Sequence, residues 1–205
     1  MAQHNILVIG AAGKTGTQLV EQGLQRGFSV TGFVRSPEKA AHLPKSVKIV
    51  QGDGMNAAQV AAAMPGHDAV FIAVGDARTF VSGPITRNAV AGMKTAGIKR
   101  LVLLSAYGIG DSAHGIHGFL ITRVLGKLNA DKMDSEAALE GSGLEWVAVR
   151  PPVLGEGPAK GPLKAGIGIK IAGFQSIPRA DLAAFMLDQL ESDTCVGKKP
   201  IVYLK

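Results

Sequence analysis

The sequence lacks most of the features that mark secreted, membrane and metal-binding proteins. Among its 205 residues there is one cysteine, Cys195, so the chain can form no internal disulfide and no cysteine-based zinc site. Its apolar runs are short, far below the roughly 20 residues of a membrane-spanning helix. The first residues show neither the basic segment nor the apolar stretch of a signal peptide. We therefore expect a cytoplasmic protein with no membrane partner.

Aromatic residues and long basic runs are scarce as well. Only 5% of the residues are aromatic, and no run of lysine or arginine exceeds two. The stacking platforms and basic stripes typical of nucleic-acid binding are therefore missing, although the net charge is +6. Small anionic ligands explain that charge equally well, so we expect no nucleic-acid partner. His114 and His117 have no further ligand nearby, and no metal site is predicted.

Glycine, in contrast, is abundant, with 27 residues, and the hydrophobic content of 46% is sufficient for a buried core. Short β-branched runs alternate with longer stretches of helical periodicity. This alternation indicates a doubly wound α/β fold with a mainly parallel sheet and helices on both faces, formed by a single domain, 1–205. The expected strands are 6–9, 29–34, 47–50, 69–74, 101–104, 146–149 and 201–204. The expected helices are 15–26, 56–64, 84–96, a longer one that ends near Leu139, and 179–190.

Residues 154–178 break this rhythm. They are rich in glycine and proline and show no helical period, so we expect a small irregular C-terminal region on the substrate side of the sheet. Its lysines are Lys160, Lys164 and Lys170. They predict either a basic rim for an anionic substrate or ordinary solvated loop residues.

Three glycines follow the first expected strand directly and open the first expected helix. Gly10 permits a tight turn, Gly13 lets the backbone approach a pyrophosphate, and Gly16 lets helix and strand pack closely. The helix N-terminus offers unpaired N–H groups to the phosphates. A glycine pattern alone is a weak signal, but the order of strand, glycines and helix favours a Rossmann-type dinucleotide site. Its expected members are Gly10, Ala12, Gly13, Lys14, Thr15 and Gly16.

The end of the second expected strand indicates which dinucleotide is bound. A site for NAD usually has an acidic residue there, whereas this chain has Arg35, with Lys39 one turn later. A guanidinium pairs with a phosphate through two hydrogen bonds, so NADP(H) is predicted; the alternative is that Arg35 is an ordinary exposed residue. Further cofactor contacts are expected from residues that end the next two strands: Asp53, Gly54, Val74 and Gly75.

The second half of the chain carries a combination of motifs. Ser105 ends the fifth expected strand, Lys132 is followed four residues later by Glu136, and Ser142-Gly-Leu and Arg150-Pro come next. In this combination the whole chain resembles the short-chain dehydrogenase/reductase superfamily in its atypical, NmrA-like branch. The resemblance implies that Ser105 and Lys132 are catalytic residues.

One departure from that superfamily bears on the chemistry. Its usual general acid is a tyrosine four residues before the lysine, and Leu128 stands there instead. Tyr107 is a candidate substitute, although its spacing from Lys132 differs from that of the family. A site without this tyrosine suits a substrate that accepts a hydride with little help from an acid, such as a flavin or a linear tetrapyrrole.

Within the superfamily the chain resembles the flavin reductase/biliverdin reductase B family, in phrases such as Val34-Arg35, Gly52-Asp53, Pro151-Pro152 and Asp181-Leu182. The resemblance implies hydride transfer from NADPH to FMN or riboflavin, and to biliverdin as a further acceptor. It places Ser105 beside the nicotinamide and the substrate, with Lys132, Val153 and Leu154 at the nicotinamide end. Val153 and Lys132 stand where mammalian members have histidine.

Two functions therefore remain open. The first is an NADPH-dependent reductase of a planar small molecule, acting as a monomer or a weak homo-oligomer. The second is a non-catalytic NADP(H)-binding redox sensor of the NmrA-like type, which the missing tyrosine also fits, although that branch is generally longer. An isomerase or dehydratase of sugar nucleotides is disfavoured because the C-terminal region is too short.

Overall fold

The computed structural model describes residues 4–75, 80–113, 126–171 and 175–204; His114 and His117 lie outside them. Six parallel strands form the central sheet in the order β3-β2-β1-β4-β5-β6. Their bounds are β1 Asn5–Ile9, β2 Ser29–Val34, β3 Lys48–Gln51, β4 Ala69–Ile72, β5 Arg100–Leu104 and β6 Glu145–Val149. The chain winds outward from β1 and then returns to β4 on its other side. The predicted doubly wound α/β fold of Rossmann type is therefore confirmed.

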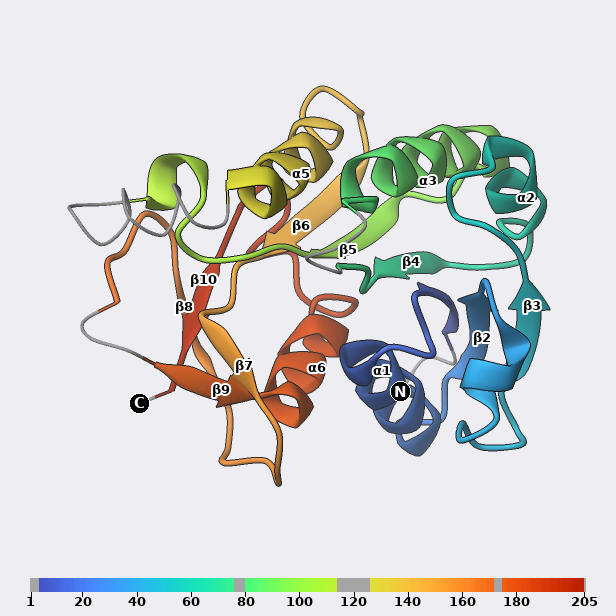
Figure 1. Cartoon of the computed structure of the whole chain (residues 1–205), viewed down its shortest axis with the longest axis horizontal. Helices are drawn as coiled ribbons and strands as arrows, with labels where there is room; N and C mark the ends of the chain where they lie inside the picture. The colour runs from blue at the N-terminus through green and yellow to red at the C-terminus, as the bar shows by residue number, and fades with distance from the viewer. Residues whose placement is uncertain (1–3, 76–79, 114–125, 172–174, 205) are drawn as a thin grey trace.

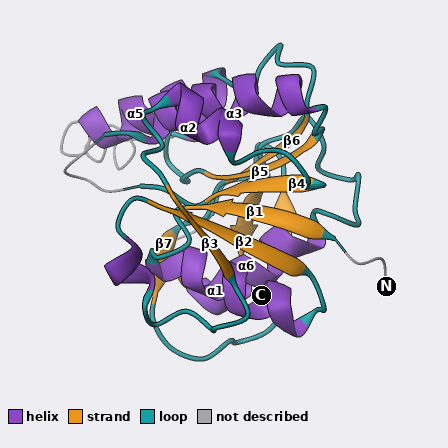
Figure 2. Ribbon diagram, turned by 90° about the vertical axis from the view of Figure 1, so that its right-hand side faces the viewer, coloured by secondary structure: helices purple, strands orange, loops and turns teal. Residues whose placement is uncertain are grey.

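Helices cover both faces of this sheet (Figure 2). On one face α1 (Lys14–Gln25) packs beside α6 (Arg179–Asp188). The opposite face is covered by α2 (Ala57–Ala62), α3 (Ser82–Ala96) and α5 (Gly126–Ala137), as Figure 1 shows. Where the structure describes their ends, these helices lie within a few residues of the predicted ranges.

The central strand β1 shows why its sequence is a continuous apolar run. Ile6 and Val8 pack in the core on the side of α1 and α6, whereas Leu7 and Ile9 pack on the side of α2 and α3. All four side chains are buried. Burial of each such side chain stabilises the fold by about 1.5–3 kcal/mol, so both layers are anchored on the same strand.

The junction of β1 and α1 requires glycine at two positions. Gly10 has a φ of +87°, in the left-handed region that other residues rarely adopt. A Cβ atom on Gly16 would lie 2.1 Å from the carbonyl oxygen of Gly10. The helix can therefore begin directly against the end of the strand, as the glycine pattern predicts.

The C-terminal part of the chain is more regular than predicted. The segment expected to be irregular contains all of β8 (Lys164–Gly166) and β9 (Ser176–Pro178), and all but the first residue of β7 (Val153–Gly155). β7 pairs with β9, and β8 pairs in antiparallel fashion with β10 (Ile201–Tyr203). β10 meets the central sheet through an isolated bridge between Arg150 and Ile201. These short pairs are built from residues distant in sequence, which local periodicity does not reveal.

Candidate active site

A cavity of about 330 Å³ opens at the carboxyl ends of the strands around β1. We call it the basic cavity, because Arg35 and Lys39 are in its wall. Most of the residues predicted to bind the cofactor line it: Gly10, Ala12, Gly13, Arg35, Lys39, Asp53, Gly54, Val74 and Gly75. Doubly wound folds bind ligands at this edge, where the strand order reverses.

The glycine loop supplies the floor of this cavity. The N–H of Gly13 donates to the carbonyl oxygen of Gly10 at 3.0 Å, which closes a tight turn. α1 then begins at Lys14, and its first turn contains no acidic residue. The first N–H groups of a helix have no partner within the helix, and its dipole adds a partial positive charge there. These groups fit a dinucleotide pyrophosphate.

Two exposed cations stand at the far end of the basic cavity. Arg35 and Lys39 line it, and in the described part of the chain no carboxylate forms an ion pair with either. Asp53 is nearby, but Oδ1 of its carboxylate accepts the N–H of Met55 at 2.9 Å. The cofactor contact expected of Asp53 stays a prediction.

A second cavity, of about 300 Å³, continues the first. We call it the serine cavity, because Ser105 lines it. The two cavities share Gly13 and the segment 73–75, so together they form one groove across the ends of β1, β4 and β5. The remaining residues that line the serine cavity are Lys14, Thr15, Leu104, Leu128, Lys132, Leu154 and Arg179.

Some predicted residues lie elsewhere. Val153, expected at the nicotinamide end, is 50% exposed and lines neither cavity. Tyr107 also lies outside both linings, and its hydroxyl oxygen accepts the N–H of Ile171 at 3.2 Å. Lys160, Lys164 and Lys170 are exposed and line neither cavity, which favours solvated loop residues over a basic rim.

Lys132 is buried beneath the groove. Its ammonium donates to the carbonyl oxygens of Val74 at 2.8 Å and Leu104 at 2.9 Å, and to Oγ of Ser82 at 3.4 Å. Lys132 therefore connects three parts of the fold: the segment after β4, the last residue of β5 and the first residue of α3. Burial lowers the pKa of Lys132 to about 8. Gly75 lies close beside it, since a Cβ there would lie 3.0 Å from Nζ.

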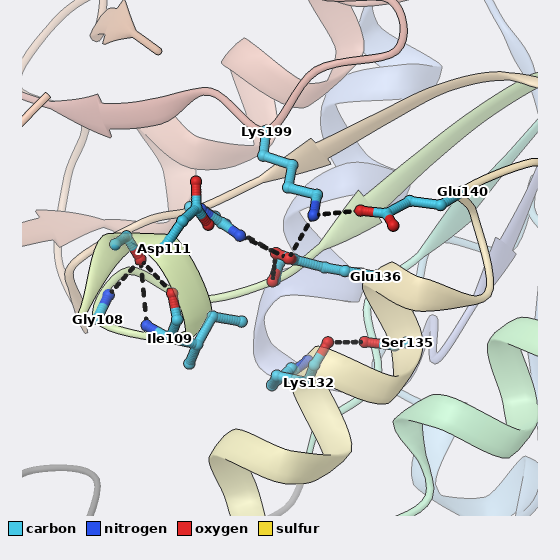
Figure 3. Close-up of polar contacts among 11 residues, drawn as sticks. Gly108, Ile109, Asp111, Lys132, Ser135, Glu136, Glu140 and Lys199 are labelled. Atoms are coloured by element: carbon cyan, nitrogen blue, oxygen red, sulfur yellow. Dashed lines mark hydrogen bonds and ion pairs between the residues drawn. The ribbon is translucent and has the colours of Figure 1, made fainter. Parts of the chain in front are cut away.

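Ser105 directly follows β5 and is hydrogen-bonded to a buried ion pair. Its hydroxyl donates to Oε1 of Glu136 at 2.5 Å. The Arg150 guanidinium donates to both oxygens of the same carboxylate, at 2.8 and 2.7 Å, and to Asp111 at 2.6 Å. Nζ of Lys199 lies 3.6 Å from Oε2 of Glu136. Figure 3 shows that Glu136 and Lys132 both lie on α5. Partial burial opposes a lower pKa for Asp111, but the hydrogen bond and charge of Arg150 outweigh it and lower that pKa.

The sequence does not predict two polar interactions near this groove. The first is the ion pair of Glu136 and Arg150: both residues belong to the family motif, but nothing in the sequence pairs them. The second is a bridge at the start of α6. Arg179 opens α6 and lines the serine cavity, where Oε1 of Glu156 accepts hydrogen bonds from Arg179 at 3.1 Å and from Lys14 at 2.7 Å. The hydrogen bond from Lys14 lowers the pKa of Glu156. No motif in the sequence indicates this bridge.

The fold and the groove define a dinucleotide-binding protein of the doubly wound α/β class. Residues 10–193 match the family model described as NAD(P)H-binding, and the chain belongs to that family. The solved structure of ChuY, described as an anaerobilin reductase from Escherichia coli O157:H7, is similar, with a TM-score of 0.85, 25% sequence identity and coverage of 98% of both chains.

Two curated relatives are similar over part of their length. An uncharacterized chloroplastic protein of Arabidopsis thaliana is 32% identical over an alignment of 171 residues, which covers 76% of this chain and 61% of that protein. The (4-alkanoyl-5-oxo-2,5-dihydrofuran-3-yl)methyl phosphate reductase of Streptomyces griseus is 29% identical over 146 residues, which are 71% of this chain and 46% of that enzyme. The finer likeness to biliverdin reductase B stays a prediction.

Two findings concern the location of the protein. Among the described residues, no helix is both long and apolar enough to cross a bilayer. The Arabidopsis relative is named as a chloroplastic protein, and the cytoplasmic location expected for this chain stays a prediction.

Proposed function

We propose that the chain is an NADPH-dependent reductase that transfers a hydride to a planar conjugated acceptor, either a flavin such as FMN or riboflavin, or a linear tetrapyrrole such as biliverdin. The observation that carries this proposal is the continuity of the two cavities, since one groove joins an exposed basic pair to a buried serine and lysine. Membership of the NAD(P)H-binding family supports the nucleotide, and the similar reductases support the reaction.

The preference for NADPH over NADH rests on the residues that follow β2. A carboxylate there would accept hydrogen bonds from the ribose hydroxyls of NADH and repel the additional phosphate of NADPH. Arg35 and Lys39 have the opposite effect, because a guanidinium and an ammonium attract that phosphate. The absence of ion-pair partners for both, within the described residues, supports their role in binding it.

The serine cavity supports a reduction in which positioning matters more than acid catalysis. The reduced nicotinamide, when bound, supplies the hydride. Leu128 and Leu154 give this end of the groove apolar walls that exclude water from stacked rings. The described lining contains no tyrosine, and the ammonium of Lys132 already donates to three oxygens. The proton that completes the reduction is therefore expected from water.

The acceptor class follows from this lack of a dedicated acid. Flavins and linear tetrapyrroles are planar, conjugated and able to delocalise the charge that the hydride brings. The anaerobilin reductase to which this chain is similar gives independent support for a tetrapyrrole. Both acceptors remain within the proposal, and the monomeric or weakly oligomeric state expected from the sequence is proposed with it.

The test combines binding and turnover. NADPH is titrated into the protein by calorimetry, and its oxidation is then followed anaerobically with FMN, riboflavin and biliverdin in separate reactions. We expect binding, and turnover above the protein-free rate with at least one acceptor. Binding of NADPH without turnover of any of the three would overturn the reductase and favour the redox sensor. Ser135→Ala serves as a control variant and should bind and turn over NADPH like the wild type. It removes a hydroxyl that donates to the carbonyl oxygen of Lys132, and Ser135 lines neither cavity.

A further inference from the structure

We infer that Ser105 acts in this groove as a hydrogen-bond acceptor, that Glu136 imposes this direction, and that the serine cavity therefore selects a ligand with an N–H donor at this point. The inference rests on the proposed function for the identity of the ligand. The inference names two possible sources of this donor: the carboxamide of the nicotinamide and the N3–H of a flavin acceptor.

The direction of the Ser105 hydrogen bond follows from the donors and acceptors around it. A serine hydroxyl has one proton and two lone pairs. The proton is donated to Oε1 of Glu136 at 2.5 Å, a distance typical of a hydrogen bond between a hydroxyl and a carboxylate. The hydroxyl therefore has no proton left for a ligand, and only its lone pairs can take part in binding.

The Glu136 carboxylate is itself held in place, so it cannot release this proton by turning away. Arg150 donates to both of its oxygens in a bidentate pair, and Glu136 and Arg150 are 3% and 2% exposed. A guanidinium stays charged at any ordinary pH, so its partner is a carboxylate that only accepts hydrogen bonds. Lys199 and Asp111 add further charges around the pair. Glu136 is thus a positioning residue that acts through Ser105.

Ser105 Oγ accepts no hydrogen bond from the residues that the structure describes. Ser105 is 4% exposed and lines the serine cavity. Lys132 lines the same cavity, but its ammonium donates to Val74, Leu104 and Ser82 instead. A ligand group that donates an N–H fills this vacancy, whereas a carbonyl oxygen there would face lone pairs and be repelled.

The first experiment removes the N–H donor from each ligand in turn. For the cofactor, NADP⁺ is compared by calorimetry with its 3-acetylpyridine analogue, in which a methyl ketone replaces the carboxamide. For the acceptor, the KM of riboflavin is compared with that of N3-methylriboflavin. We expect at least one pair to differ by about fivefold in the wild-type protein, the effect of one neutral hydrogen bond, and that pair identifies the source of the donor.

Ser105→Ala shows whether this difference belongs to Ser105. Alanine leaves Glu136 paired with Arg150, so the variant is expected to fold, and the discrimination should fall to within about twofold, as in a double-mutant cycle. Ser135→Ala, which removes a buried hydroxyl on α5 outside the groove, should retain the discrimination. Discrimination in neither pair, or discrimination that persists in Ser105→Ala, overturns the inference. A wild-type protein that does not bind NADP⁺ at all overturns the proposed function instead.

Glu136→Gln tests the positioning role separately. The glutamine amide can donate to Ser105, which frees the serine proton to point into the cavity, so the preference for the N–H ligand should shrink or reverse. If Glu136 has only a structural role, the variant should bind both ligands of a pair more weakly by the same factor. An unchanged ratio of the two affinities would therefore contradict the positioning role of Glu136. If this variant does not fold, the comparison of wild type with Ser105→Ala decides the inference.

Discussion

Replacement of Arg35 with alanine is expected to weaken NADPH binding about 30-fold and to leave NADH binding nearly unchanged. Arg35 lies at the exposed rim of the basic cavity, without a carboxylate partner among the described residues. A hydrogen bond to a charged group contributes about 1.5–3 kcal/mol, and exposure to solvent favours the lower half of that range. A loss of about 2 kcal/mol corresponds to about 30-fold in affinity.

The measurement is a calorimetric titration of wild type and variant with both nucleotides. Lys45→Ala is the matched control, because it also removes one positive charge from an exposed residue but lines neither cavity. It should change neither affinity by more than about twofold. Equal losses for NADPH and NADH in Arg35→Ala, or a similar loss in Lys45→Ala, would refute the assignment of Arg35 to the additional phosphate.

Three further predictions concern the buried groups of the site. NADPH affinity should fall several-fold between about pH 7 and about pH 9. In this range the ammonium of Lys132, with its pKa of about 8, loses its charge while the nucleotide phosphates stay ionised. In Lys132→Met, calorimetry should show an NADPH affinity that does not change over the same range. Arg150→Met leaves the buried Glu136 carboxylate without its guanidinium and should lower the free energy of unfolding by about 3–5 kcal/mol in urea titrations, whereas a loss under about 1 kcal/mol would contradict the role of this pair. Gly16→Ala should lower both the melting temperature and NADPH affinity, since its Cβ meets the Gly10 carbonyl; an unchanged melting curve would count against the tight junction.

The central sheet could be predicted because its signals are local. The inner strands β1, β4 and β5 are covered on both faces, so their sequences are continuous apolar runs. Gly27 and Gly97 mark helix ends with a positive φ. The short strands β7, β8 and β9 could not be predicted, because glycine and proline obscure their pattern. Their stability comes from pairing with distant segments, as when Ala165 pairs with Val202.

The site divides in the same way. The glycine loop and Arg35 follow directly after strands, and Lys39 lies one turn further on, so the topology brings them to one edge of the sheet. The sequence is therefore sufficient to place them. The bond from Ser105 to Glu136 depends on the relative position of β5 and α5, which no spacing specifies. The place of Val153 at the nicotinamide end rests on the resemblance alone and stays a prediction, since its side chain is half exposed and lines neither cavity.

A crystal structure of the protein with NADP⁺ tests the central claim most directly. The 2′-phosphate should lie on Arg35 and Lys39, the pyrophosphate on the N–H groups that begin α1, and the nicotinamide in the serine cavity beside Ser105. A nucleotide bound in the opposite direction, or one whose nicotinamide lies outside the serine cavity, would contradict the account.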